Sequence, residues 1–148
     1  MFRTILVALD GDAHTQRALA HALDLSRRHG ATLIGLHVMD SYLKRFHNEI
    51  YAVGRQEYLD HVDRCLREGA ERILREFQNL AEKEDVRAKP KLRHGDPLEE
   101  IVEESRSDEV DLLIIGGKRL HGFDRWRSGN LPEKLAAIVE TPLLIVRQ

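Results

Sequence analysis

The sequence has little of several features that mark specialised proteins. It contains one cysteine and one tryptophan in 148 residues, and its formal net charge is -2. A lone thiol cannot close an internal disulfide, which fits a reducing compartment. A charge so close to zero provides no field that would recruit nucleic acid or an anionic membrane. No apolar stretch reaches the ~20 residues of a membrane span and no signal peptide is recognisable, so we expect a cytoplasmic protein.

The composition is that of a single globular domain over residues 1–148. Hydrophobic residues make up 42% and charged residues 32% of the chain, without repeats or linkers. This length can bury a core without disulfides or metal ions. The eight histidines do not have metal-ligand spacing: His14, His21 and His29 lie seven and eight residues apart in one helical pattern. We therefore predict no metal site.

Short apolar runs alternate with helical patterns along the chain. The predicted strands cover residues 4–9, 32–38, 86–93, 112–115 and 143–146, and the predicted helices cover residues 14–29, 55–84, 98–106 and 131–140. Pro90 assigns the third strand to an edge of the sheet. Gly30 is a fitting end for the first helix, while Asp96 and Pro97 form an N-cap and first helical position. The alternation predicts an α/β fold with a doubly wound parallel sheet.

Residues 111–130 form the pattern of a phosphate-binding loop. A buried strand breaks at Gly116 and Gly117, a loop with glycines and cations follows, and a helix begins at Leu131. Exposed backbone N–H groups and the helix dipole favour anions at such a junction. In open α/β sheets, ligands bind at the carboxyl ends of strands where the strand order reverses. We therefore expect Asp10 to meet ribose or adenine, and the Val38 backbone to meet the edge of a base.

Several residues have a structural alternative to a functional role. Asp10 could cap a turn or helix as readily as it could contact a ligand. The cations near the loop form either an anion-binding cluster or a solvated face; they are Lys118, Arg119, Arg125 and Arg127. Trp126 is expected to pack or to contact a second copy, and His37 to be a hydrogen-bonded core residue. Cys65 is expected to be buried and inert.

Five segments together carry a resemblance to a known family. They are Ile5 to Asp10 before a helix, Leu36-His37-Val38, the turn His94-Gly95-Asp96-Pro97, Asp111 to Gly116, and Thr141 to Arg147. With these segments in this order, the chain resembles the universal stress protein family along its whole length. The resemblance implies an adenine nucleotide alpha hydrolase-like fold with a five-stranded sheet ordered 3-2-1-4-5. It also implies a homodimer paired through the last strand, residues 143–146, and ATP binding in one branch of the family.

The loop departs from the pattern of the ATP-binding branch. That pattern is Gly-x-x-Gly, nine residues, then Gly followed by Ser or Thr. Gly116 and Gly129 fit it, but Arg119 replaces the second glycine and Asn130 replaces the Ser or Thr. Arg119 either obstructs a triphosphate or gives it a charge-assisted contact. Asn130 can still donate a hydrogen bond, and Gly117 and Gly122 are expected to supply flexibility that Arg119 removes.

Three hypotheses for the function follow from these observations. The first is a homodimeric stress or signalling module that binds ATP, AMP or another adenine nucleotide, with Mg²⁺ accompanying ATP. The second is a nucleotide-free regulatory dimer in which Arg119 fills the phosphate site. The third and least favoured is a slow nucleotide hydrolase, since no catalytic constellation is recognisable. The predicted nucleotide-binding residues are Ala8, Asp10, Val38, Gly116, Gly117, Arg119, Gly122, Gly129, Asn130 and Leu131. The sequence identifies neither the stress signal nor a protein partner.

Overall fold

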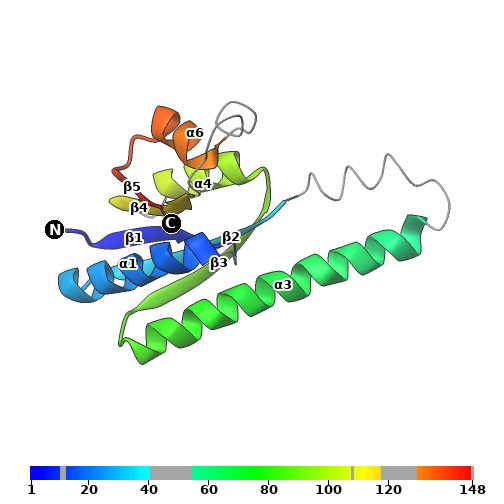
Figure 1. The fold of residues 1–148 in the computed structure, drawn as a ribbon, viewed down its shortest axis with the longest axis horizontal. Coiled ribbons are helices and arrows are strands. Elements are labelled where there is room, and N and C mark those ends of the chain that lie inside the picture. Colours follow the sequence, from blue (N-terminus) through cyan, green and yellow to red (C-terminus); the bar gives the residue numbers. More distant parts are fainter. Residues whose placement is uncertain (11–12, 41–54, 108, 118–129, 148) are drawn as a thin grey trace.

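The structure is a computed structural model that describes residues 1–10, 13–40, 55–107, 109–117 and 130–147. Strands and helices alternate along these residues (Figure 1). The strands are β1 (Thr4–Ala8), β2 (Thr32–Asp40), β3 (Ala88–Gly95), β4 (Leu112–Gly117) and β5 (Leu143–Arg147). The helices are α1 (Ala13–His29), α3 (Arg55–Lys83), α4 (Pro97–Arg106) and α6 (Leu131–Ile138).

All strand pairs are parallel, and the five-stranded sheet has the order β3-β2-β1-β4-β5. The predicted doubly wound α/β fold and the 3-2-1-4-5 order are therefore confirmed. The order reverses between β1 and β4, which are neighbours although α1, β2, α3, β3 and α4 separate them in the chain. The carboxyl ends of β1 and β4 thus meet at the switch point of the sheet.

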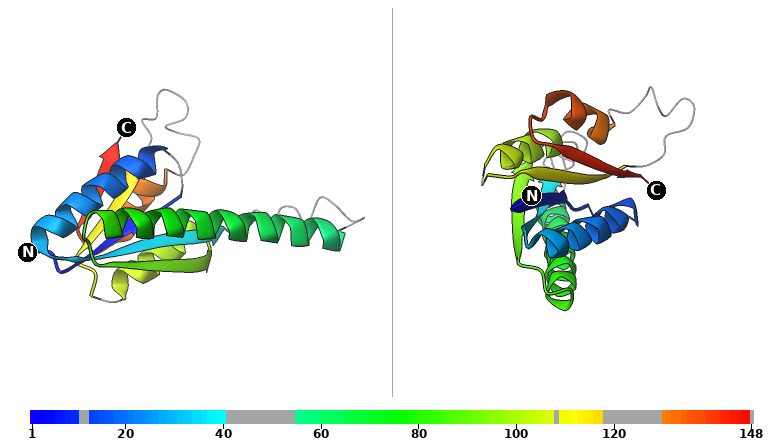
Figure 2. Two further views of the ribbon diagram at one scale, coloured as in Figure 1. Left: turned by 90° about the horizontal axis from the view of Figure 1, so that it is seen from below. Right: turned by 90° about the vertical axis from the view of Figure 1, so that its left-hand side faces the viewer.

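Helices cover both faces of the sheet, so each face has its own apolar core. Figure 2 shows α4 and α6 on one face and α1 and α3 on the other. Alternation along β1 divides its side chains between the two cores: Ile5 and Val7 pack toward α1 and α3, and Leu6 packs toward α4 and α6. All three are fully buried. Strands buried on both faces explain why their sequences are continuous apolar runs.

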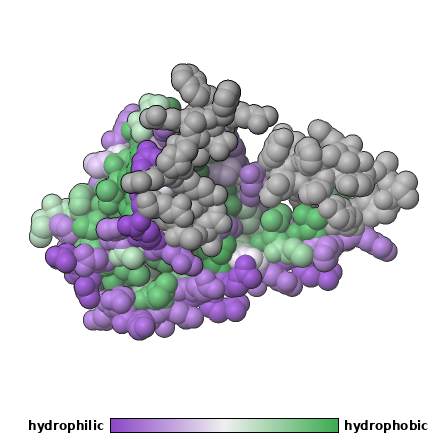
Figure 3. Space-filling model, in the orientation of Figure 1, coloured by the Kyte–Doolittle hydropathy of each residue, from purple (hydrophilic) through white to green (hydrophobic). Residues whose placement is uncertain are grey.

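Only the C-terminal half of α3 packs on the sheet, in contrast to the prediction that its whole stripe does so. Phe77 and Ala81 are buried against the core, whereas the N-terminal half extends beyond the strands (Figure 2). Cys65 lies in this extension and is exposed, so the prediction of a buried thiol was wrong. The outer, lower side of α3 is hydrophilic in Figure 3, as its charged residues require.

Four strands run further than predicted, β2, β3, β4 and β5, because a neighbouring strand continues beside each of them. β4 reaches Gly117, since Gly116 pairs with Val146 and Gly117 with Arg147. Likewise β2 reaches Asp40, and the paired segment of β3 continues to Gly95, in place of the predicted turn. The predicted break at Gly116 was therefore placed two residues too early.

Pro90 lies in the edge strand β3, as predicted. The N–H of Leu33 donates to the carbonyl of Arg87 at 2.8 Å. Arg87 and every second residue after it therefore direct their backbone N–H and carbonyl groups toward β2. Pro90 is in the other set, and its nitrogen faces the open edge. The missing N–H consequently removes no bond of the ladder.

The predicted helix ends at Gly30 and Asp96 are also confirmed. Gly30 has a φ of 64°, the left-handed conformation that ends a helix and that glycine adopts without strain. The Asp96 side chain accepts a hydrogen bond from the N–H of Glu99 at 3.1 Å, with Pro97 at the first helical position. Helix α6 ends at Ile138, two residues before the prediction, because Val139 is already extended and Pro142 follows.

Candidate functional site

A cavity of about 370 Å³ lies at the carboxyl ends of β1, β2 and β4, beside the N-termini of α4 and α6. We call it the switch-point crevice. Its lining includes seven of the ten residues predicted as a binding site: Ala8, Asp10, Val38, Gly116, Gly117, Asn130 and Leu131. The other three, Arg119, Gly122 and Gly129, lie outside the described residues, as do Lys118, Arg125, Trp126 and Arg127. Chain segments more than 100 residues apart thus meet in one crevice.

Asp10 stands at the exit of β1 with an exposed side chain. The hydroxyl of Thr15, a buried residue in the first turn of α1, donates a hydrogen bond to its Oδ1 atom. The carboxylate therefore tethers the start of α1, as the structural alternative proposed, and also lines the crevice. A carboxylate has about four lone-pair sites, and the hydrogen bond from Thr15 occupies one of them.

Val38 presents its backbone to the crevice because β1 ends before β2 does. The N–H of Thr32 donates to the Arg3 carbonyl at 2.9 Å, and the Leu36 carbonyl accepts from Leu9 at 2.8 Å. Alternate residues of β2 therefore direct their backbone N–H and carbonyl groups toward β1, and Val38 is the next residue in that set. The paired segment of β1 ends at Ala8, opposite Leu36. The backbone groups of Val38 thus lie just beyond the last paired residues of β1 and β2, at the edge of the crevice.

The first turn of α6 borders the crevice on the β4 side. Asn130 is the N-cap residue, but its side chain makes no capping hydrogen bond; its carbonyl accepts from Lys134 at 3.0 Å. The unpaired N–H groups of a first helical turn, together with the helix dipole, favour an anion. This end of the crevice therefore has the polarity expected for a phosphate group.

Gly117 allows close packing at the end of β4. A Cβ atom there would lie 3.2 Å from Cγ2 of Ile145 and 3.5 Å from Cγ of Pro132. Among the described glycines only Gly30 and Gly95 have positive φ. Gly117 is thus a strand residue at which a side chain would crowd Ile145 of the neighbouring strand β5, and the prediction that it supplies loop flexibility was wrong.

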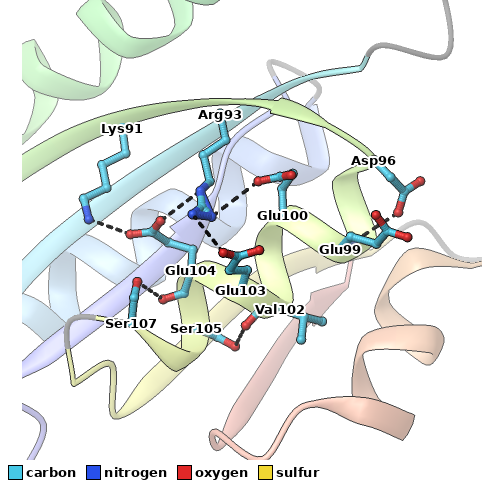
Figure 4. A network of polar contacts seen from close by, with 10 residues as sticks. All are labelled: Lys91, Arg93, Asp96, Glu99, Glu100, Val102, Glu103, Glu104, Ser105 and Ser107. Carbon is cyan, nitrogen blue, oxygen red and sulfur yellow. Dashed lines mark hydrogen bonds and ion pairs between the residues drawn. The ribbon is translucent and has the colours of Figure 1, made fainter.

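The wall opposite α6 is formed by α4, which contributes Pro97 and Ile101. Charged side chains fasten this helix to β3 (Figure 4). Glu104, with only 4% of its side chain exposed, lies 2.6 Å from Nζ of Lys91 and 3.2 Å from Nε of Arg93. The network fixes the helix that carries this wall of the crevice.

Sequence reasoning did not assign Thr15, Pro97 and Ile101 to the site. Thr15 follows Asp10 by five residues in the first helical turn, where a hydroxyl can bond back to the strand end. The helix with Pro97 at its start follows β3 directly, so its N-terminus had to lie at the carboxyl edge of the sheet. Both signals were present in the sequence, and the topology was needed to interpret them.

A second cavity of about 430 Å³ lies between α1 and α3 on the other face of the sheet. Its wall is mostly apolar, with Leu19, Leu23, Ile73 and Phe77, and none of the predicted site residues lines it. Apolar surface is visible on this side of the molecule in Figure 3. The switch-point crevice is the better candidate because it combines an apolar floor with a carboxylate, open backbone groups and a helix N-terminus.

Two further features concern the described part of the chain. No group of three or more His, Cys, Asp or Glu side chains there is arranged to hold a metal ion. In the same residues, no helix is both long enough and apolar enough to span a membrane.

The fold and the cavity define a doubly wound α/β protein with a crevice at its switch point. The model of the universal stress protein family matches residues 1–147, and the chain belongs to that family. This confirms the resemblance seen in the sequence. A universal stress protein of Thermus aquaticus is 30% identical over 152 residues, covering 99% of this chain and all of that protein.

Solved structures of the same fold include nucleotide complexes. A universal stress protein family protein of Arabidopsis thaliana with AMP bound has a TM-score of 0.70 and 20% identity, covering 99% of this chain and 92% of that one. The universal stress protein of Archaeoglobus fulgidus in complex with dAMP has a TM-score of 0.65 and 17% identity, covering 98% of each chain. At identities this low, the structural likeness shows a shared fold and nothing more.

Proposed function

We propose that this protein is a regulatory module that binds an adenine nucleotide in the switch-point crevice and acts as a homodimer. The observation that carries the proposal is the meeting of Asp10, the Val38 backbone and the N-terminus of α6 in one cavity. These groups suit the three parts of a nucleotide. Asp10 accepts hydrogen bonds from ribose hydroxyls, Val38 offers a donor and an acceptor to the edge of adenine, and α6 attracts phosphate.

The size of the crevice and the ligands of related proteins support the same class of ligand. A volume of about 370 Å³ falls in the range of ~300–1,000 Å³ that is usual for small-molecule sites. Structural neighbours carry AMP or dAMP. With no protein metal cluster among the described residues, Mg²⁺ would accompany ATP mainly through its phosphate oxygens. Whether Arg119 obstructs a triphosphate or contacts it stays a prediction from the sequence.

Calorimetric titration of the purified protein with AMP and with ATP tests nucleotide binding. We expect saturable binding of AMP in the micromolar range, and a loss of about tenfold or more in Asp10→Ala, because one hydrogen bond to a charged acceptor is worth roughly 1.5–3 kcal/mol. Asp40→Ala is the control, since Asp40 ends β2 but does not line the crevice.

Failure of the wild type to bind either nucleotide at millimolar concentration would refute this proposal in favour of the nucleotide-free dimer. Phosphate release from ATP that disappears in Asp10→Ala would instead indicate a slow hydrolase.

The dimer is proposed to form through β5, the strand at one edge of the sheet. The N–H of Leu113 donates to the carbonyl of Pro142 at 2.8 Å. The backbone polar groups that face β4 are therefore those of Pro142, Leu144 and Val146. The N–H groups of Leu143 and Ile145 then point to the open edge. No other described strand pairs with this edge, and an edge with apolar side chains such as Leu144, which is 37% exposed, favours pairing with a second copy.

Proline substitution separates edge pairing from folding. Ile145→Pro removes an outward N–H without removing a bond to β4, so we expect a folded monomer where the wild type sediments at twice the monomer mass. Leu144→Pro removes a bond of the ladder and should destabilise the fold itself. A wild-type monomer, or an Ile145→Pro dimer with unchanged stability, would refute pairing through β5.

A further inference from the structure

The side chain of His37 makes a contact that changes the end of the β1–β2 ladder. Its Nδ1 atom lies 2.7 Å from the carbonyl oxygen of Leu9, and His37 is a half-buried residue that lines the crevice. A carbonyl oxygen can only accept, so Nδ1 must carry the proton. The neutral ring then has an unprotonated Nε2 atom. His37 is a hydrogen-bonded histidine as expected, but it stands at the site and not deep in the core.

The Leu9 carbonyl accepts the hydrogen bond from His37. In a continued β1–β2 ladder, the same carbonyl would accept from the N–H of Val38. The N–H of Leu9 donates to the Leu36 carbonyl at 2.8 Å. The next bond of a parallel ladder would run from the N–H of Val38 to the carbonyl of Leu9. Among the described residues, no backbone hydrogen bond from that N–H is formed. The imidazole thus takes the place of a main-chain donor at the last position before the crevice.

We propose that His37 is a positioning residue of the switch-point crevice. By donating to the Leu9 carbonyl, His37 satisfies the last backbone acceptor at the end of β1. The N–H of Val38 then remains available to donate to the edge of the base. His37 also fixes the peptide that precedes Asp10. The proposal rests on the proposed nucleotide-binding function and adds to it the reason why the backbone of Val38 is open to a ligand.

A matched pair of substitutions isolates the hydrogen bond. Asparagine places its amide N–H₂ close to the position of the histidine Nδ1–H, so His37→Asn keeps the donor. Leucine has a similar size and no donor, so in His37→Leu the Leu9 carbonyl becomes available to Val38. The ligands are AMP and ribose 5-phosphate, which lacks the base.

Calorimetry should distinguish positioning from general support of the fold. We expect His37→Leu to weaken AMP binding about tenfold, the equivalent of one lost hydrogen bond, while the affinity for ribose 5-phosphate is unchanged. His37→Asn should stay within about threefold of the wild type for both ligands. Equal losses for the two ligands, or wild-type AMP affinity in His37→Leu, would overturn the proposal.

A measurement without ligand separates this proposal from the proposed function. Nitrogen-15 NMR of the ligand-free protein at mildly alkaline pH should show a protonated Nδ1 and an unprotonated Nε2 in His37. The Val38 amide should exchange rapidly in the wild type and slowly in His37→Leu. An Nε2–H tautomer or a protected wild-type Val38 amide overturns the role of His37 even when AMP binds. A wild type that binds no nucleotide refutes the proposed function, and the role in base recognition falls with it.

Discussion

Replacement of Gly35 by alanine is expected to lower the free energy of unfolding by about 2–3 kcal/mol. Gly35 lies in the middle of β2, where a Cβ atom would stand 2.6 Å from Cε1 of Phe77 and 2.7 Å from its Cδ1 and Cζ atoms. The Phe77 ring cannot swing away easily, since it is 1% exposed. The missing side chain is therefore what lets α3 lie close to the sheet.

Urea unfolding of Gly35→Ala measures this effect, and the chain offers a matched control. Gly69 lies inside α3, and a Cβ atom added there would meet nothing within 4 Å beyond its own helix backbone and chain neighbours. The same substitution there should stabilise the protein by roughly 0.5–1 kcal/mol, because alanine is the better helix former. Adding Phe77→Leu to Gly35→Ala should restore part of the lost free energy of unfolding, because the leucine side chain is smaller than the phenylalanine ring. Wild-type stability of Gly35→Ala alone would contradict close packing at this point.

The contact between Gly35 and Phe77 illustrates which parts of the fold a sequence can predict. The strands were predictable because continuous apolar runs bounded by Gly, Asp and Pro are typical of strands buried on both faces. The strand order came from the family resemblance. The pairing of Gly35 with one ring on α3 depends on the distance and rotation between two elements 42 residues apart, and no local pattern encodes these.

The extension of α3 beyond the sheet was hidden for a similar reason. An apolar stripe indicates which face of a helix is buried, but it does not indicate how far the partner surface extends. Sequence periodicity therefore placed Cys65 in a packed interface, whereas the N-terminal half of α3 extends beyond the strands and Cys65 is exposed.

The candidate site was predictable where topology alone determines it. Asp10, Val38 and Gly116 each stand at or near the carboxyl end of a strand, and the doubly wound order brings these ends together. Thr15 and His37 were not assigned because their roles depend on the direction of a side chain toward a main-chain or carboxylate oxygen. Alternation of faces along a strand does not reveal such hydrogen bonds.

Loss of the Glu104 carboxylate is expected to cost about 3 kcal/mol of stability, the lower end of the range for breaking a buried ion pair. The carboxylate is almost fully buried between Lys91 and Arg93, whose side chains are 32% and 26% exposed. In Glu104→Ala both cations keep their charge at the interface between β3 and α4 and lose their shared buried partner, while Nη1 of Arg93 stays 3.3 Å from the Glu100 carboxylate. Partial exposure of the cations limits the cost because water can still reach them.

Glu103 is a control on the same helix, since its carboxylate lies 3.8 Å from Nη2 of Arg93 but its side chain is 70% exposed. Glu103→Ala should change stability by less than about 0.5 kcal/mol, as exposed ion pairs do. Because α4 also carries Pro97 and Ile101 into the crevice, Glu104→Ala should weaken AMP binding by more than Glu103→Ala does. The double variant Lys91→Met/Glu104→Met should recover stability relative to Glu104→Ala, since a packed apolar pair can substitute for a buried ion pair. Equal stability of Glu104→Ala and Glu103→Ala in urea would mean that apolar packing alone holds α4 against the sheet.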